Sequence, residues 1–129
     1  MTDKIDVREY INDMDVCMAA ADLIICRAGA ITLSELLACG KPSILIPSPY
    51  VAENHQFHNA MTLKRIGAAE IIEEKDLTAN KLIEVVEKLI CDKDSLSKMS
   101  NAAREGSIID ANERIYKIVM KLYNKSVAK

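Results

Sequence analysis

Residues 23–49 read LIICRAGAITLSELLACGKPSILIPSP, and this stretch decides the fold. Two short apolar runs, at 23–26 and 43–47, flank a segment of helical spacing at 31–39, and polar residues occur only at the junctions. Apolar runs of this length predict buried strands. Gly40 followed by Pro42 predicts the end of the helix, because Gly adopts the left-handed conformation and Pro cannot continue a helix. Strand, helix and strand in close succession are typical of a parallel α/β sheet covered on both faces.

The same alternation extends toward both ends of the chain. The first half of residues 4–11 alternates between apolar and polar residues and predicts a strand, and residues 68–74 predict another, which gives about four strands. Helices are predicted from Asn12 or Asp13 onward and over 55–66, where Gly67 ends the pattern. The sequence therefore predicts one α/β domain over residues 1–129, with a parallel sheet of about four strands flanked by helices.

The last third of the chain is predicted to be entirely helical. Leu77 and Leu82 have the spacing of a hydrophobic staple around Thr78 as N-cap, and Ser95 is the predicted cap of the next helix. Asp110 and Glu113 have capping-box spacing before a closing helix. The apolar stripe of that helix is formed by Ile115, Ile118, Val119 and Leu122.

Composition limits the classes of function. The chain has 129 residues, 50% of them hydrophobic, and a formal net charge of −2, so it lacks the basic surface that nucleic-acid binding needs. Cys17, Cys26, Cys39 and Cys91 form no CxxC pair, which favours a reduced, cytosolic protein. No apolar run approaches the roughly 20 residues of a membrane helix, and the polar start does not resemble a signal peptide.

The turn after residues 23–26 is a candidate anion site. Ligands of parallel sheets bind at the carboxyl ends of strands, where loops lead into helix N-termini. Gly29 allows a close backbone approach, and the free N–H groups of Ala30, Ile31 and Thr32 would point outward at the positive end of the helix dipole. A phosphate there would also accept hydrogen bonds from Thr32 or Ser34.

A purely structural role is also open for these residues. Glu35, one turn into the helix, is placed to bind two hydroxyls of a ribose or a sugar, yet Thr32 and Glu35 also match the S/T-x-x-E capping box. Arg27 is placed to neutralise a diphosphate or to form a surface ion pair.

A second candidate site follows residues 43–47. His55, Gln56, His58 and Asn59 crowd the start of the next helix, where Asn54 is a natural N-cap. Uncharged donors and acceptors suit a ligand rich in hydroxyls, such as a sugar. Metal binding by the two histidines is a weaker hypothesis, because no third ligand is evident and the composition points to no metal.

No catalytic motif accompanies these two sites. The sequence has no G-x-S-x-G elbow and no H-E-x-x-H segment, and no cysteine lies beside a histidine. Glu53 or His55 could act as a base, but neither is paired with a nucleophile. No catalytic residue is therefore assigned in this chain.

Several segments together resemble the carboxyl-terminal part of the MurG family of glycosyltransferases. They are YINDM at 10–14, residues 21–49, ENHQFHNA at 53–60, IGAAEIIEEKDLT at 66–78 and DANERI at 110–115. The resemblance implies a GT-B fold, in which two Rossmann-like domains face a cleft and the carboxyl-terminal domain binds the UDP-sugar donor. It implies transfer of N-acetylglucosamine (GlcNAc) to undecaprenyl-diphospho-muramoyl-pentapeptide in peptidoglycan synthesis, with UDP-GlcNAc as donor and no cofactor or metal.

The resemblance also gives each turn a role. Ile11 would meet the uracil ring through its backbone, and Glu35 would hold the ribose hydroxyls. Gln56, with His55 beside it, would contact hydroxyls of GlcNAc. The diphosphate and sugar would be lined by Ala30, Ile31, Thr32, Leu33 and Ser34.

The match lacks the family's acceptor domain and the first strands of the donor domain. An inverting displacement needs an acceptor held in line with the sugar, so the chain alone is expected to be inactive. An open sheet edge would favour pairing with a second copy. The resemblance further implies a cytoplasmic protein that contacts the membrane only peripherally. Two alternatives stay open: a stand-alone donor subunit of a two-chain GlcNAc transferase, and a nucleotide-sugar-binding module without catalysis.

Overall fold

The fold is built on a parallel sheet whose strands are the apolar runs of the sequence. The computed structural model describes residues 4–107 and 111–128. Strands β1 (Ile24–Cys26), β2 (Ser43–Leu45) and β3 (Ala69–Ile71) lie in that order and are all parallel, with Ile25 opposite Ile44. The predicted α/β class is confirmed, with three strands among the described residues where about four were expected.

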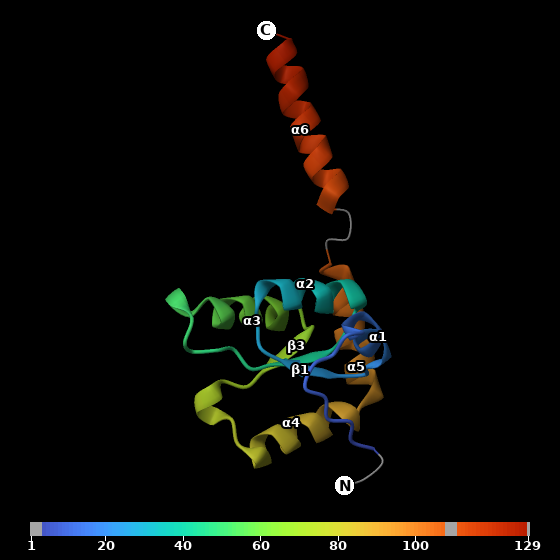
Figure 1. Cartoon of the computed structure of the whole chain (residues 1–129), viewed down its shortest axis with the longest axis vertical. Helices are drawn as coiled ribbons and strands as arrows, with labels where there is room; N and C mark the ends of the chain where they lie inside the picture. Colours follow the sequence, from blue (N-terminus) through green and yellow to red (C-terminus); the bar gives the residue numbers. More distant parts are fainter. Residues whose placement is uncertain (1–3, 108–110, 129) are drawn as a thin grey trace.

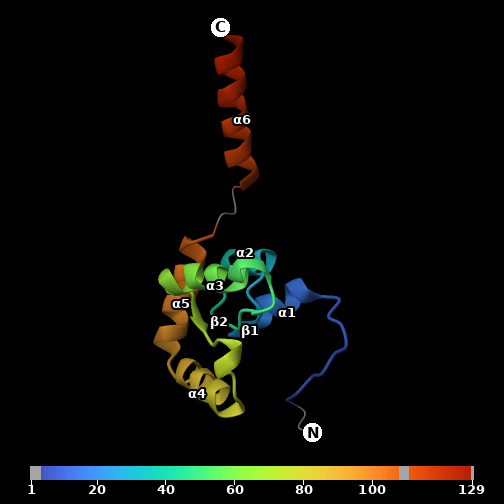
Figure 2. The ribbon, with the colours of Figure 1, turned by 90° about the vertical axis from the view of Figure 1, so that its left-hand side faces the viewer.

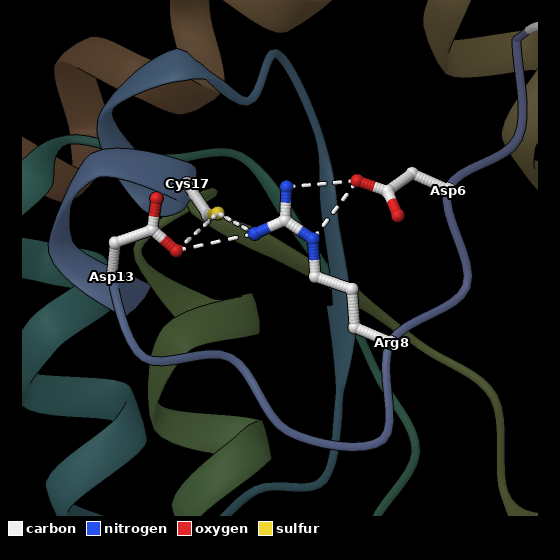
Figure 3. Close-up of polar contacts among 4 residues, drawn as sticks. All are labelled: Asp6, Arg8, Asp13 and Cys17. Atoms are coloured by element: carbon white, nitrogen blue, oxygen red, sulfur yellow. Dashed lines mark hydrogen bonds and ion pairs between the residues drawn. The ribbon is translucent and has the colours of Figure 1, made fainter.

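The strand predicted in the first half of residues 4–11 is wrong, because this segment is irregular. A strand is stable only when a neighbour satisfies its backbone hydrogen bonds, and no strand of the described structure pairs with this segment. Side-chain contacts within the segment and with the start of α1 stabilise it. The guanidinium of Arg8 lies 2.8 Å from the carboxylate of Asp6 and 3.2 Å from that of Asp13, and it also contacts Cys17 (Figure 3). The hydrogen bond to Asp6 and the charge of Asp6 raise the pKa of Arg8.

Helices cover both faces of the sheet (Figures 1 and 2). Helices α2 (Ala30–Cys39) and α3 (His55–Arg65) lie on one face and α4 (Ala79–Ile90) on the other, while α5 (Lys93–Glu105) contacts both α2 and α4. Neighbouring residues of β2 pack on opposite faces of the sheet, because successive side chains of a strand point in opposite directions. Leu45 belongs to the cluster with Leu33, Leu36, Ala60 and Leu63, and Ile44 to the cluster with Ile72, Leu89 and Met99.

Most predicted helix ends are confirmed. Helix α1 (Met14–Ala20) follows Asp13 as N-cap, and α2 ends at Gly40 in the left-handed conformation with φ 64°. Gly67 follows α3 with φ 84°, and the side chain of Thr78 accepts a hydrogen bond from Lys81 N at the start of α4.

The predicted cap of α5 is wrong. Ser95 lies inside the first turn, and the N-cap is Asp92, whose carboxylate accepts a hydrogen bond from Ser95 N at 3.2 Å. Two short 3-10 helices, η1 (Ala52–Asn54) and η2 (Glu74–Asp76), complete the loops after β2 and β3.

The closing helix α6 (Ala111–Val127) projects away from the rest of the domain in both views (Figures 1 and 2). Its predicted apolar stripe is exposed, with Ile115, Ile118, Val119 and Leu122 between 54% and 63% accessible. Asp110, the predicted cap, lies outside the described residues. Among the described helices none combines the length and the apolarity needed to cross a membrane.

Candidate functional site

Two loops at the carboxyl edge of the sheet form the candidate site. Residues 27–29 connect β1 to α2, and residues 46–54, which include η1, connect β2 to α3. Because the strands are parallel, both loops emerge at the same edge, where ligands of open α/β sheets bind. The two predicted clusters, around residue 30 and around residue 56, are therefore neighbours in space.

The N-terminus of α2 offers free amides. Gly29 is the N-cap, with φ −69° and ψ 147°, and no side chain caps the helix. The first bond of the helix runs from Leu33 N to Gly29 O at 3.0 Å, so Ala30, Ile31 and Thr32 have no carbonyl acceptor within the helix. Thr32 is the third helical residue, which makes its interpretation as the N-cap of a capping box wrong. The amides and the helix dipole favour an anion at this position.

The next residues of α2 divide between solvent and core. Leu33 is 5% exposed and packs in the core, and its N–H is already bonded to Gly29. Ser34 is exposed and donates its hydroxyl to Ala30 O at 3.1 Å. Glu35 is exposed one turn into the helix, and the described structure gives its carboxylate no ion pair or hydrogen bond. Its predicted role with ribose hydroxyls stays a prediction.

Arg27 forms the surface ion pair that was one of its two interpretations. Its Nη2 lies 2.9 Å from Glu74 Oε1, and its Nη1 donates to Ile46 O at 3.3 Å. Both side chains are partly exposed, with 51% of Arg27 and 31% of Glu74 accessible. The guanidinium therefore links the loop after β1 to η2 and to the end of β2.

Gln56 connects the two loops directly. Its Oε1 accepts hydrogen bonds from Ala28 N at 3.3 Å and from Ser48 N at 2.9 Å. One turn later on α3, Asn59 Nδ2 donates to Ala28 O at 3.4 Å. With its oxygen engaged, Gln56 has its amide nitrogen left to donate to a ligand. These contacts cross 28 and 31 residues of sequence, so no local pattern could have predicted them.

His55 and its neighbours form an exposed turn. His55 is the first residue of α3, and its Nε2 lies 3.7 Å from Glu53 Oε2, with both side chains well exposed. Glu53 and Asn54 adopt positive φ values of 54° and 56°, which is unusual for residues other than glycine. Asn54 occupies the predicted N-cap position, but its side chain makes no capping hydrogen bond.

Two further features complete the description of the candidate residues. A hollow of about 360 Å³ adjoins the loop after β2 and is lined in part by Pro47, Tyr50, Phe57 and Lys75; sequence reasoning did not single it out. Ile11 is half-buried in the irregular segment before α1, and its predicted contact with a base stays a prediction. Among residues 4–107 and 111–128, no three His, Cys, Asp or Glu side chains are grouped as metal ligands.

Comparisons with known proteins agree with this architecture. The glycosyltransferase family 28 C-terminal domain model matches residues 1–117. A UDP-N-acetylglucosamine–N-acetylmuramyl-(pentapeptide) pyrophosphoryl-undecaprenol N-acetylglucosamine transferase of Acetivibrio thermocellus is 51% identical over 124 residues, covering 96% of this chain and 34% of the relative. A protein of the same name from Thermoanaerobacter sp. strain X514 is 50% identical, covering 94% of this chain and 35% of the relative.

A solved structure has the same fold. The crystal structure of Acinetobacter baumannii MurG matches with a TM-score of 0.82 and 33% identity, over 90% of this chain and 33% of that one. The chain thus spans about a third of the length of the relatives it matches. The family model covers all three strands and the helices α1 to α5, and on this match the chain belongs to the glycosyltransferase family 28 C-terminal domain family.

Proposed function

We propose that this chain binds UDP-GlcNAc as the donor part of a MurG-like GlcNAc transferase. The observation that carries the proposal is the row of free amides at Ala30, Ile31 and Thr32, one turn before the exposed carboxylate of Glu35. The relatives' names support the choice of sugar and nucleotide. In this proposal, Glu35 holds the ribose hydroxyls, Ile11 meets the uracil, and Gln56 and His55 face the GlcNAc hydroxyls.

The amides would act on the leaving group. In the proposed reaction a hydroxyl of the lipid-linked acceptor attacks the anomeric carbon of GlcNAc and gives up its proton to a base on the acceptor side. The bond from that carbon to the diphosphate oxygen breaks, and UDP departs with the electron pair. Negative charge therefore grows on the diphosphate in the transition state. Preorganised N–H groups stabilise such charge because they need no reorientation during the reaction.

We propose that the acceptor is bound elsewhere, so that the chain alone does not turn over. Positioning of two reactants in line supplies a large share of the rate of such displacements. Incubation of the purified chain with UDP-GlcNAc and the undecaprenyl-linked acceptor should give no transfer. Formation of product by this chain would contradict the assignment. The lipid-linked acceptor would bring the complete enzyme to the cytoplasmic face of the membrane.

Calorimetric titration tests the donor site. UDP-GlcNAc should bind saturably and more tightly than UDP-glucose or ADP-glucose. Glu35→Ala should weaken UDP-GlcNAc binding about fivefold or more, because a charged hydrogen-bond partner is lost. Absence of saturable binding would refute the proposal. UDP-GlcNAc binding that is unchanged by Glu35→Ala would favour a nucleotide-sugar-binding module without catalysis. Transfer activity that appears when a separate acceptor-binding chain is added would identify a two-chain transferase.

We propose a second copy of the chain as partner at the free edge of β1. Ile24 N and Cys26 O bond toward β2, so the N–H and C=O of Ile25 face the open edge. An unpaired edge is a template for another strand. Light scattering should detect a dimer at high concentration, and Ile25→Lys should return it to a monomer; a monomer for the unaltered chain would refute the pairing.

A further inference from the structure

Two amide side chains of α3 hold one residue of the loop after β1. Gln56 Oε1 accepts from the N–H of Ala28, and Asn59 Nδ2 donates to the C=O of the same residue. Residues three apart lie on the same face of a helix, so both side chains reach the loop from one side. Ala28 itself is fully buried, with an exposed fraction of 0%.

Among the described residues, no side chain fixes the backbone at Gly29, the residue that follows Ala28. Gly29 stands between Ala28 and the free amides, and a Cβ built on it would touch nothing within 4 Å. A glycine in open space has wide conformational freedom. Helix α2, whose first bond runs from Leu33 N to Gly29 O, fixes the amides of Ala30, Ile31 and Thr32. The N–H of Gly29 is the neighbouring donor whose direction depends on what holds the peptide before it.

The contact of Asn59 sets that peptide plane. The carbonyl of Ala28 and the N–H of Gly29 belong to one planar trans peptide and point in opposite directions. A hydrogen bond that draws the carbonyl toward α3 consequently turns the N–H of Gly29 away from α3. We infer that Asn59 is a positioning residue of the donor site, which aligns the N–H of Gly29, beside the helical amides of residues 30–32, for the diphosphate; the inference rests on the proposed function.

This role differs from a direct contact with the sugar. A residue that binds only the GlcNAc hydroxyls affects UDP-GlcNAc and leaves UDP unchanged. A residue that aligns the diphosphate amides affects UDP and UDP-GlcNAc equally and leaves uridine unchanged. The three ligands therefore separate the two roles.

Asn59→Leu is the informative substitution, because it keeps the approximate shape of the side chain and removes the donor without adding a charge near the diphosphate. Loss of one hydrogen bond should weaken UDP and UDP-GlcNAc by a similar factor of about five, with uridine affinity unchanged in NMR titrations. Thr62→Ala is the matched control on the same helix, because among the residues that the structure describes its hydroxyl bonds only to His58 O within α3. A loss confined to UDP-GlcNAc, or no loss for either nucleotide, would overturn the inference.

A readout without ligand keeps the two proposals distinguishable. In Asn59→Leu the NMR order parameter of the backbone amide of Gly29 should fall, whereas those of α4 should not change. An unchanged order parameter at Gly29 would overturn the positioning role whether or not nucleotides bind. Failure of the unaltered chain to bind any of the three ligands would count against the proposed function alone. If melting curves show that Asn59→Leu is unfolded, Asn59→Ala takes its place in both measurements.

Discussion

The side chain of Arg104 on α5 lies directly over Gly40 at the end of α2. A Cβ built on Gly40 would stand 2.5 Å from Arg104 Nε and 2.6 Å from its Cγ. The same turn is fixed from α5 by Ser100, whose hydroxyl donates to Gly40 O at 2.6 Å. Gly40 thus combines a left-handed backbone with a close helix contact, and both depend on the missing side chain.

Gly40→Ala should destabilise the domain. A residue with a Cβ costs about 1–2 kcal/mol in the left-handed conformation, and the contact with Arg104 would add to that loss. Urea unfolding followed by circular dichroism would measure the change. Gly29→Ala is the control, since its φ is −69° and its Cβ would meet open space. Equal losses for both variants would contradict the explanation.

Ile44 and Ile25 provide a matched pair of core and edge positions. They lie opposite each other in the register of β1 and β2, but Ile44 is 0% exposed and Ile25 is 43% exposed. Ile44→Ala should cost about 2–5 kcal/mol in free energy of unfolding, because it removes buried methyl groups and leaves a cavity. Ile25→Ala should cost clearly less. Denaturant midpoints with unchanged m-values would establish the difference, and similar losses for the two variants would contradict the contrast in burial between Ile44 and Ile25.

The strands and most helix ends could be predicted from local chemistry. Gly40, Gly67 and Thr78 act through their own backbone or the adjacent turn, so the sequence around each suffices. The strand predicted in 4–11 failed because pairing depends on a neighbour, which no local pattern contains. Ser95 failed for a related reason: Asp92 three residues earlier competes for the same N-cap, and its carboxylate accepts from Ser95 itself.

The sequence predicted where the candidate site lies in the fold, but it did not predict the side-chain contacts within the site. The glycine turn and the strand ends brought residues 27–35 and 53–59 to one edge of the sheet, as expected for parallel strands. The capping box was wrong because α2 begins at Ala30, two residues before Thr32. The contacts of Gln56 and Asn59 with Ala28 join segments far apart in sequence and follow only from packing of α3 beside the loop.

The cysteines should differ in reactivity. Burial raises the pKa of the Cys26 thiol, whereas Cys39 and Cys91 are exposed. Because the thiolate is the nucleophile, Cys26 should be alkylated by iodoacetamide more slowly than the two exposed residues at pH 8. Mass spectrometry of the labelled peptides would give the order. In urea the rates should converge, and equally fast labelling of Cys26 in the folded chain would contradict its burial.

Asp92 should make stability depend on pH in acid. Hydrogen bonds from the side chain and backbone of Ser95 hold the pKa of Asp92 below its ordinary value of 3.8. A depressed pKa in the folded state means that the stabilisation is fully present above the ordinary value and is lost as pH falls through the folded pKa. Asp92→Ala should therefore lower Tm at pH 7, and the difference from the unaltered chain should shrink toward pH 2.

The control separates the charge of Asp92 from its capping role. Asp92→Asn keeps a good N-cap acceptor for α5 and removes the titrating group. Its Tm at pH 7 should lie between those of the unaltered chain and Asp92→Ala. Its own capping contribution should not change with pH, because a neutral amide does not titrate in this range. Thermal melts of the three proteins at pH 7, 4 and 2 would test this, and a constant gap between the unaltered chain and Asp92→Ala would show that the carboxylate does not cap the helix in its charged form.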